Sequence, residues 1–251
     1  MIHIIAGATC REAVRSRAFL GLLALYAVGV LLSRVVGWVS ATVNDEITTD
    51  LVLSLQSVIG VLVAIATGTA LVQAEIQSRT LYTVLTRPLP RWQFVLGKYC
   101  GLTLALLAGQ AAMLVLGLLY LWLTGAPVTP WLALAGALTA LEVLVMAAVS
   151  LCWTALSSPL LAAALSLATY ALGHAVISLP DLIHHLKGWH QTAAIVMASL
   201  VPNCGWFTYR NEAVHGLPLP PGQGLLALGY AAAWISLLVA ITVAVFRRKQ
   251  L

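Results

Sequence analysis

Long apolar runs separated by short polar segments dominate the chain. The runs cover approximately residues 18–41, 51–74, 99–123, 131–156, 159–178 and 225–246. As a helix, a run of about 20 apolar residues is long enough to cross the roughly 30 Å hydrocarbon core of a bilayer. The runs are continuous rather than alternating, which argues against a β-barrel. The pattern predicts an all-α integral membrane protein whose six transmembrane helices form a single domain over residues 1–251.

Two segments outside these runs differ from ordinary loops. Residues 1–17 combine apolar positions with a charged side, which is typical of a helix lying on the inner membrane surface. Its charged residues are Arg11, Glu12, Arg15 and Arg17. Residues 179–223 are rich in proline and glycine, and their apolar part is too short to span a bilayer. We expect two short half-helices there before the last span, although a surface helix packed on the bundle explains the segment equally well.

The composition excludes an ordinary soluble domain. The chain is 61% hydrophobic and 8% charged, and its mean hydropathy is +0.97. Topology explains the formal net charge of +5, because cytoplasmic loops of membrane proteins collect Lys and Arg. The sequence contains no basic face with interleaved aromatic residues, so we expect no nucleic-acid binding.

The charged residues orient the predicted spans. Most basic residues fall on one side: Arg11, Arg15, Arg17, Arg79, Arg87, Arg91, Lys98, Arg247, Arg248 and Lys249. The acidic residues of the other side are Asp45, Glu46, Asp50, Asp181 and Glu212. Residues 44–50 are therefore expected to form an acidic outer loop. By the positive-inside rule, both termini of this multi-pass protein face the cytoplasm.

Small residues recur at intervals of four along the third span, interrupted by Met113. They are Gly97, Gly101, Ala105, Gly109 and Gly117. Such a stripe lets helix backbones approach closely, and we favour packing within the chain over a dimer interface. The four cysteines lie far apart in the sequence, at Cys10, Cys100, Cys152 and Cys204, so we expect no disulfide within the chain.

Glu142 lies near the middle of the fourth span, where an ionisable group is costly and by default marks function. Arg34 lies in the outer third of the first span, from which it could extend toward the outer interface or toward Glu142. A structural interpretation, in which Glu142 is protonated or bonded to a Ser or Thr hydroxyl of the bundle, remains open beside the functional one.

Histidines in the outer segment raise the question of a metal site. They are His184, His185, His190 and His215, with Met197 and Cys204 nearby. No pair of these histidines has the i, i+4 spacing that places two imidazoles on one helix face. We therefore expect no metal site, and interpret these histidines as interfacial.

Motifs for chemistry within the chain are missing. The sequence has no phosphate-binding loop, no HExxH and no GxSxG, and no pair of carboxylates lies close enough in sequence for acid–base catalysis. We therefore expect no catalytic residue, no cofactor and no enzyme activity in this chain by itself.

A basic segment between the second and third spans carries the strongest functional signal. Glu75 and Arg79 have the i, i+4 spacing of an exposed helix, and Pro88 and Pro90 end that helix. The helix would extend beyond the membrane with apolar side chains that still need a surface to cover them. The pattern therefore favours a segment that another protein binds.

The chain resembles permeases of the type-2 ABC exporter superfamily along essentially its whole length. Three stretches carry the resemblance: residues 11–19 (REAVRSRAF), residues 75–98 (EIQSRTLYTVLTRPLPRWQFVLGK), and the closing pattern of residues 211–216 (NEAVHG) with the last span and FRRK. The subgroup it is most similar to contains permeases associated with multicopper-enzyme maturation, such as the one serving nitrous-oxide reductase. The substrate remains open.

The resemblance implies a division of labour in a bacterial plasma (inner) membrane. Two cytoplasmic ABC ATPase subunits, which bind ATP and Mg, would pair with this chain and with a second copy or a homologous permease. Membrane lipid and a periplasmic or extracellular accessory protein are further expected partners. The resemblance also implies that residues 1–17 form a connecting helix and residues 75–98 a coupling segment. The coupling residues would be Glu75, Arg79, Thr80, Tyr82, Arg87, Pro88 and Arg91.

Two other function classes remain as alternatives. One is an ion-coupled secondary transporter using Glu142 and Arg34, which would need more midplane charge and broken helices. The other is a membrane-embedded lipid enzyme or assembly scaffold, which would act without any ATPase.

Overall fold

The computed structural model describes residues 2–39, 44–78, 91–178 and 199–248. Its elements are α1 (Ile2–Arg15), α2 (Arg17–Val39), α3 (Asn44–Ser78), α5 (Arg91–Thr124), α6 (Pro130–Leu156), α7 (Pro159–Ala175), η1 (Val176–Ser178), η2 (Cys204–Trp206), α10 (Arg210–Val214) and α11 (Gln223–Arg248). These described ranges contain no β-strand. The predicted all-helical class is therefore confirmed for them.

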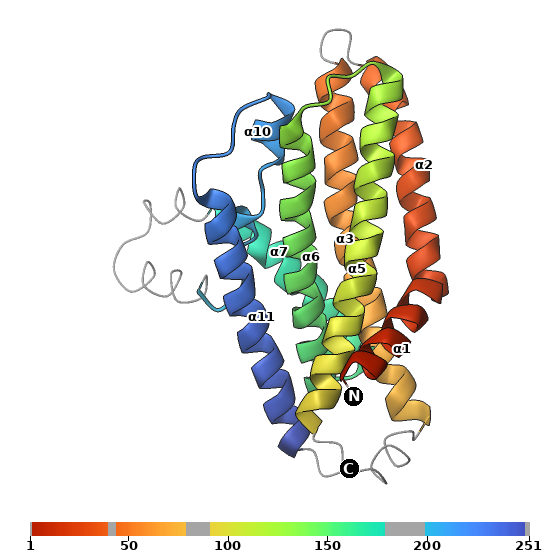
Figure 1. Cartoon of the computed structure of the whole chain (residues 1–251), viewed down its shortest axis with the longest axis vertical. Coiled ribbons are helices and arrows are strands. Elements are labelled where there is room, and N and C mark those ends of the chain that lie inside the picture. The colour runs from red at the N-terminus through yellow and green to blue at the C-terminus, as the bar shows by residue number, and fades with distance from the viewer. Residues whose placement is uncertain (1, 40–43, 79–90, 179–198, 249–251) are drawn as a thin grey trace.

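The long helices run side by side as a bundle (Figure 1). Helix α6 packs against α3, α5, α7 and α11, while α2 packs against α3 on the opposite side. The end of α3, the beginning of α5 and the end of α11 lie at one end of the bundle; α10 lies at the other (Figure 1). Within an apolar 18-residue stretch of each helix, the buried share is 72% for α6 and 17% for α11. Helix α6 is therefore the centre of the molecule and α11 is peripheral.

Four of the described helices, α3, α5, α6 and α11, are long and apolar enough to cross a membrane. A fifth span is possible if α1 and α2 count as one, although they bend by 52° at their junction. Helix α7 has 17 residues, fewer than the roughly 20 that a full crossing takes. The prediction of a helical protein with several membrane-spanning segments is confirmed in this coarser form, while the number six stays a prediction.

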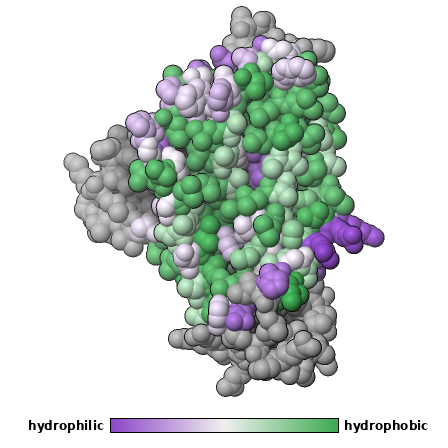
Figure 2. Space-filling view, in the orientation of Figure 1, coloured by the Kyte–Doolittle hydropathy of each residue, from purple (hydrophilic) through white to green (hydrophobic). Residues whose placement is uncertain are grey.

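The surface of the bundle is broadly hydrophobic (Figure 2). Leu160 and Leu225 are 86% and 78% exposed, and many other large apolar side chains on the long helices are exposed as well. A contiguous apolar surface of this extent marks a region that contacts membrane or another protein. The surface agrees with a membrane-embedded bundle.

The expected acidic loop over residues 44–50 is wrong. Helix α3 begins at Asn44 and includes Asp45 and Glu46 in its first turn. Acidic side chains at this position stabilise a helix, because its N-terminus carries partial positive charge. Thr49 also donates its hydroxyl to the Asp45 carbonyl at 2.7 Å, which satisfies the hydroxyl inside the helix.

Helix α1 packs one face against α5. Its buried positions Ala6, Thr9 and Ala13 are three or four residues apart and so share a face. The charged residues predicted for an interfacial helix are exposed: Arg11, Glu12, Arg15 and Arg17, the last at the start of α2. Hydrophilic residues are visible at the corner between α1 and α2 (Figure 2). The membrane-surface location of α1 itself stays a prediction.

The stripe of small residues on α5 packs within the chain, as predicted. A Cβ atom added at Gly101 would collide with the Ala6 carbonyl oxygen and lie 2.6 Å from Thr9 Cβ. At Gly109 it would lie 2.9 Å from the Phe19 ring. The missing side chains therefore let α1 and α2 approach the α5 backbone closely.

Candidate functional site

Glu142 is the buried carboxylate at the centre of the bundle. It lies near the middle of α6, and 3% of its surface is exposed. Nearly every residue of α6 that follows it is also buried, because α3, α5 and α11 cover that helix. An ionisable group in such surroundings is stabilised only if hydrogen bonds replace the water it has lost.

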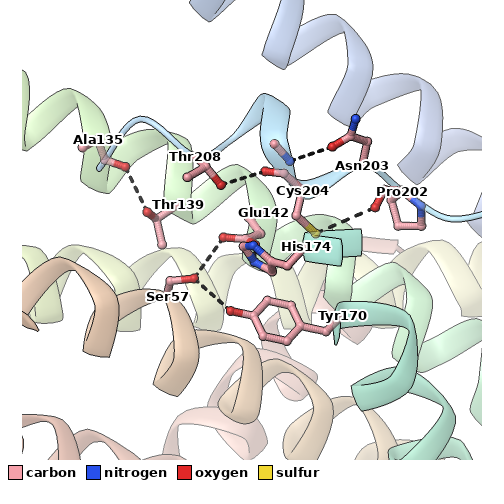
Figure 3. Close-up of polar contacts among 11 residues, drawn as sticks. Ser57, Ala135, Thr139, Glu142, Tyr170, His174, Pro202, Asn203, Cys204 and Thr208 are labelled. Carbon is pink, nitrogen blue, oxygen red and sulfur yellow. Dashed lines mark hydrogen bonds and ion pairs between the residues drawn. The ribbon is translucent and has the colours of Figure 1, made fainter. Parts of the chain in front are cut away.

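Those hydrogen bonds come from two other helices (Figure 3). Ser57 on α3 donates its hydroxyl to Glu142 Oε2 at 3.0 Å. On α7, His174 Nε2 lies 2.8 Å from Glu142 Oε1. The Tyr170 hydroxyl lies 3.3 Å from Ser57 Oγ, and the Tyr170 ring meets the His174 ring edge-on with centroids 4.7 Å apart. The carboxylate is thus fixed from both sides by residues that are far away in sequence.

Cys204 in η2 brings a thiol to the same place. It is 2% exposed, and its Sγ, one Glu142 oxygen and one His174 ring nitrogen all lie within 4.8 Å of one another. Gly173 permits this approach, since a Cβ there would lie 2.7 Å from Cys204 Sγ. Burial, followed by the nearby Glu142 carboxylate, raises the pKa of the Cys204 thiol. The thiol is therefore protonated at neutral pH.

The turn that carries Cys204 is held by its own hydrogen bonds. The Asn203 side chain accepts from the Gly205 backbone N–H at 2.8 Å, and the Asn203 backbone N–H donates to the Tyr230 hydroxyl of α11 at 2.7 Å. Thr208 donates its hydroxyl to the Cys204 carbonyl at 3.1 Å. These contacts fix the position of the thiol relative to α6 and α7 (Figure 3).

A cavity of about 100 Å³ with a mixed polar and apolar lining adjoins the carboxylate. Its lining residues are Leu53, Ser57, Thr139, Glu142, His174, Phe207, Thr208, Tyr209 and Arg210. At the α10 side, Arg210 Nε forms an ion pair of 2.7 Å with Asp50 Oδ1, and both side chains are partly exposed. The cavity thus extends from the buried carboxylate to the partly exposed Arg210.

This arrangement can bind a cation or carry a proton. A carboxylate, an imidazole and a thiol converge on one point, and all of them ligate metals or exchange protons. The cavity provides room for water next to Glu142 and His174.

The structure describes only part of the predicted coupling segment. Glu75 lies in the last turns of α3 and Arg91 is the first residue of α5, but the positions of their side chains are outside the described residues. Arg79, Thr80, Tyr82, Arg87 and Pro88 also lie outside them. Their proposed role stays a prediction.

The possible contact of Arg34 with Glu142 is likewise untested, because the Arg34 side chain is outside the described residues. The observed partners of Glu142 are Ser57 and His174. Bonding to a hydroxyl of the bundle, the structural interpretation considered from sequence, therefore holds for Ser57. It does not exclude a functional role.

The structure describes only one of the four outer histidines, His215. His184, His185 and His190 lie outside the described residues, together with Met197. His215 is exposed, with Nδ1 at 2.8 Å from the Asn211 carbonyl oxygen and Nε2 at 3.9 Å from Glu46. Cys204, grouped with these histidines from sequence, instead lies beside Glu142.

His174 is the residue that sequence reasoning missed. It lies inside the fifth apolar run, where an imidazole is as unusual as the carboxylate of Glu142 and carries the same signal. Ser57 and Tyr170 gave no such signal, because hydroxyl groups are common in membrane helices. No protein-family model and no curated protein matches the chain.

Proposed function

We propose that this chain is the transmembrane permease subunit of an ATP-driven exporter, coupled through residues 75–98 to a separate cytoplasmic ATPase. The observation that supports the proposal is the length and direction of α3 and α5. Helix α3 has 35 residues and α5 has 34, which correspond to lengths of about 50 Å each at 1.5 Å per residue. Both exceed the roughly 30 Å of bilayer hydrocarbon.

The excess length lies where the basic segment joins the two helices. The apolar run of α3 ends at about residue 74, four residues before the helix ends at Ser78. Helix α5 begins at Arg91, eight residues before its apolar run begins at about residue 99. This is also the end of the bundle at which α11 finishes (Figure 1). A protein bound there could act on two long helices at once.

Helix α3 would carry such a movement into the bundle. It holds Ser57, whose hydroxyl bonds Glu142 on α6, so a shift of α3 would change the surroundings of the buried carboxylate. Helix α1 would move together with α5, because Gly101 allows their close contact. In this proposal, ATP and Mg bound by two partner ATPases drive the movement of these helices. A second permease copy or homologue completes the path of the transported species across the membrane.

The setting of the proposal is a bacterial inner membrane with both termini in the cytoplasm. The transported species could be a lipid, a peptide, a drug or an ion-related ligand, or the complex could do mechanical work on an accessory protein outside the membrane. The chain itself performs no catalysis in this scheme.

Affinity purification of the full chain from its native membrane in mild detergent tests the proposal. We expect a stoichiometric ATPase subunit that carries a phosphate-binding loop. Glu75→Lys and Arg79→Glu should each weaken its retention at least about tenfold, because a reversed charge opposes its counterpart across the interface. Glu46→Lys makes the same charge change at the other end of α3 and should retain the ATPase.

Two results would contradict the proposal. One is recovery of the chain alone under conditions in which a known permease–ATPase complex survives. The other is equal retention of the ATPase by Glu75→Lys, Arg79→Glu and Glu46→Lys.

The cluster around Glu142 favours a second candidate, an ion-coupled transporter. A buried carboxylate paired with an imidazole at 2.8 Å beside a cavity has the chemistry of a proton or cation site. Transport by the purified chain in liposomes without ATPase, abolished by Glu142→Gln and retained by Glu46→Gln, would favour this candidate. Absence of any ion-driven flux would contradict this second candidate.

A further inference from the structure

Three potential metal ligands converge from separate parts of the chain. Glu142 comes from α6, His174 from α7 and Cys204 from η2, and one ligand atom of each lies within 4.8 Å of the other two. Glu142 and Cys204 are almost completely buried, while the His174 side chain is 34% exposed. Three different ligand types collected at one point inside an apolar bundle require an explanation.

We propose that Glu142, His174 and Cys204 bind one zinc-type divalent cation. The proposal does not depend on the permease function, since it rests on the ligand geometry alone. The three side chains would supply a carboxylate oxygen, the Nε2 of the imidazole and a thiolate sulfur. Water from the adjoining cavity would occupy the fourth position.

The ligand types select the metal. Zinc in proteins is bound by these three donors, and three protein ligands with one open position are typical of sites where a water or substrate also binds. Charge supports a divalent ion, because its +2 charge is balanced by one carboxylate and one thiolate. A neutral site costs far less than a charged one in apolar surroundings.

The geometry requires only small movements. With zinc–nitrogen and zinc–oxygen bonds of about 2.0–2.2 Å, tetrahedral ligands lie about 3.4 Å apart. His174 Nε2 and Glu142 Oε1 lie 2.8 Å apart, so a cation would replace their hydrogen bond after a separation of about half an ångström. The sulfur lies within 4.8 Å of both and would move inward.

Neighbouring residues orient the ligands. Ser57 donates to Glu142 Oε2 and leaves Oε1 free to face His174. The Tyr170 ring meets the His174 ring edge-on, and the hydrogen bonds of Asn203 hold the turn of Cys204. Loss of such a supporting contact typically weakens metal affinity by about ten- to a hundredfold.

The cavity supplies the remaining requirements. Its volume of about 100 Å³ exceeds the roughly 10–15 Å³ that one water molecule needs, so water can occupy it. Coordination forms a metal–sulfur bond and breaks the S–H bond of Cys204, and the released proton passes to water. The proton of the hydrogen bond between His174 Nε2 and Glu142 Oε1 also leaves through water, to Nδ1 of a neutral His174 or otherwise to solvent, so that Nε2 and Oε1 are both free to bind the ion. The cavity reaches Arg210, whose side chain is partly exposed.

Cobalt binding to the full-length protein tests the proposal. The purified chain is stripped with a chelator in detergent and titrated with CoCl₂. A background with Cys10→Ala, Cys100→Ala and Cys152→Ala keeps Cys204 as the sole thiol. We expect one cobalt per chain, a near-ultraviolet thiolate-to-cobalt charge-transfer band, and displacement of cobalt by ZnCl₂.

Variants identify the ligands. Cys204→Ser should abolish the charge-transfer band, His174→Gln should weaken cobalt affinity at least about tenfold, and Ser57→Ala should weaken it by roughly ten- to a hundredfold through misorientation of Glu142. His215→Ala alters an exposed histidine outside the triad and should leave affinity unchanged. Size-exclusion profiles check folding, and the Ser57→Ala variant keeps all three ligands if a ligand variant misfolds.

Several outcomes would overturn the proposal. One is failure of the Cys204-only protein to bind stoichiometric cobalt. The others are a cobalt complex that lacks the thiolate band and a band that persists in Cys204→Ser. Binding that survives in Cys204→Ser but disappears after replacement of His184, His185 and His190 would place the metal elsewhere and equally contradict the triad.

Discussion

Glu142 gains its stability from partners on two different helices. Ser57 donates to one carboxylate oxygen and His174 contacts the other, so each of these polar side chains depends on the carboxylate in turn. Removing one member of a buried polar cluster leaves the others without partners, and that cost exceeds the loss of a single hydrogen bond. The cluster should therefore respond very differently to substitutions that keep or remove hydrogen-bonding capacity.

Glu142→Ala should lower the free energy of unfolding by about 1–3 kcal/mol, because Ser57 and His174 lose their partner. Glu142→Gln should cost less than about 1 kcal/mol, since its amide can accept from Ser57 and donate to His174. Thermal unfolding of the detergent-purified protein compares the two, with exposed Glu46→Gln as the control. Equal destabilisation by Ala and Gln would contradict the observed hydrogen bonds.

The Cys204 thiol should be slow to alkylate. Its pKa is raised by burial, so at a given pH its reactive thiolate fraction is smaller than that of an ordinary cysteine and grows about tenfold with each pH unit. At pH 8 we expect alkylation in the folded, metal-free protein to be at least about tenfold slower than in denatured protein. Mass spectrometry of the peptide containing Cys204 measures both rates; equal rates would show that the thiol is accessible and ionised.

At this scale the sequence identifies single residues better than their partners. Glu142 is evident because a carboxylate interrupts an apolar run. Its partners Ser57 and His174 are 85 and 32 residues away, and their meeting depends on how α3 and α7 are rotated against α6. Proximity in the chain groups Cys204 with the outer histidines, because the sequence does not indicate which way the turn of η2 faces.

Among the helices, α5 shows how the absence of side chains sets a contact. Gly101, Gly109 and Gly117 face α1, α2 and α3, and the Cβ of a larger residue there would collide with these neighbours. Gly117, for example, leaves room for the Tyr26 hydroxyl, which would lie 2.6 Å from an added Cβ. The contact between these helices therefore depends on glycine rather than on complementary side chains.

Gly101→Ala should destabilise the protein by about 1–3 kcal/mol, because the added methyl group meets the α1 backbone at Ala6, which cannot rotate away. Gly229→Ala in α11 is the matched control. A Cβ there meets nothing within 4 Å, so the substitution should be neutral or stabilise the helix by up to about 1 kcal/mol. The unfolding temperatures of the two variants measure this difference. A similar change in unfolding temperature for both variants would contradict the packing of α1 on α5.

Helix boundaries were predictable where apolar runs end at proline or at a turn. The run predicted for residues 131–156 matches α6, which begins at Pro130 and ends at Leu156. The start of α3 was not predictable from hydropathy, because its first turns are polar and are stabilised by helix-terminal charge instead. Helix α7 likewise differs from the prediction: it has 17 residues, whereas the sequence predicts a full membrane span there.

For the whole molecule, the arrangement of helix ends implies a sidedness. The turn between α5 and α6 lies at one end of the bundle, and the end of α11 lies at the other (Figure 1). In a cysteine-free background, Val128→Cys in that turn should react with a membrane-impermeant maleimide added to intact cells. Gln250→Cys near the C-terminus should react only after permeabilisation. Labelling of both from the same side would contradict the bundle as a transmembrane unit.

Helices α6 and α11 differ in burial: the buried share of their apolar stretches is 72% and 17%. This difference has a consequence for how the sequences of related chains diverge. A helix surrounded by protein accepts few changes of volume, whereas a helix facing lipid accepts almost any apolar residue of similar length. Along α11, Leu, Ile, Val and Phe should therefore replace one another freely between relatives, while α6 keeps its residue sizes. A pair of relatives aligned over both helices should differ several times more often in α11.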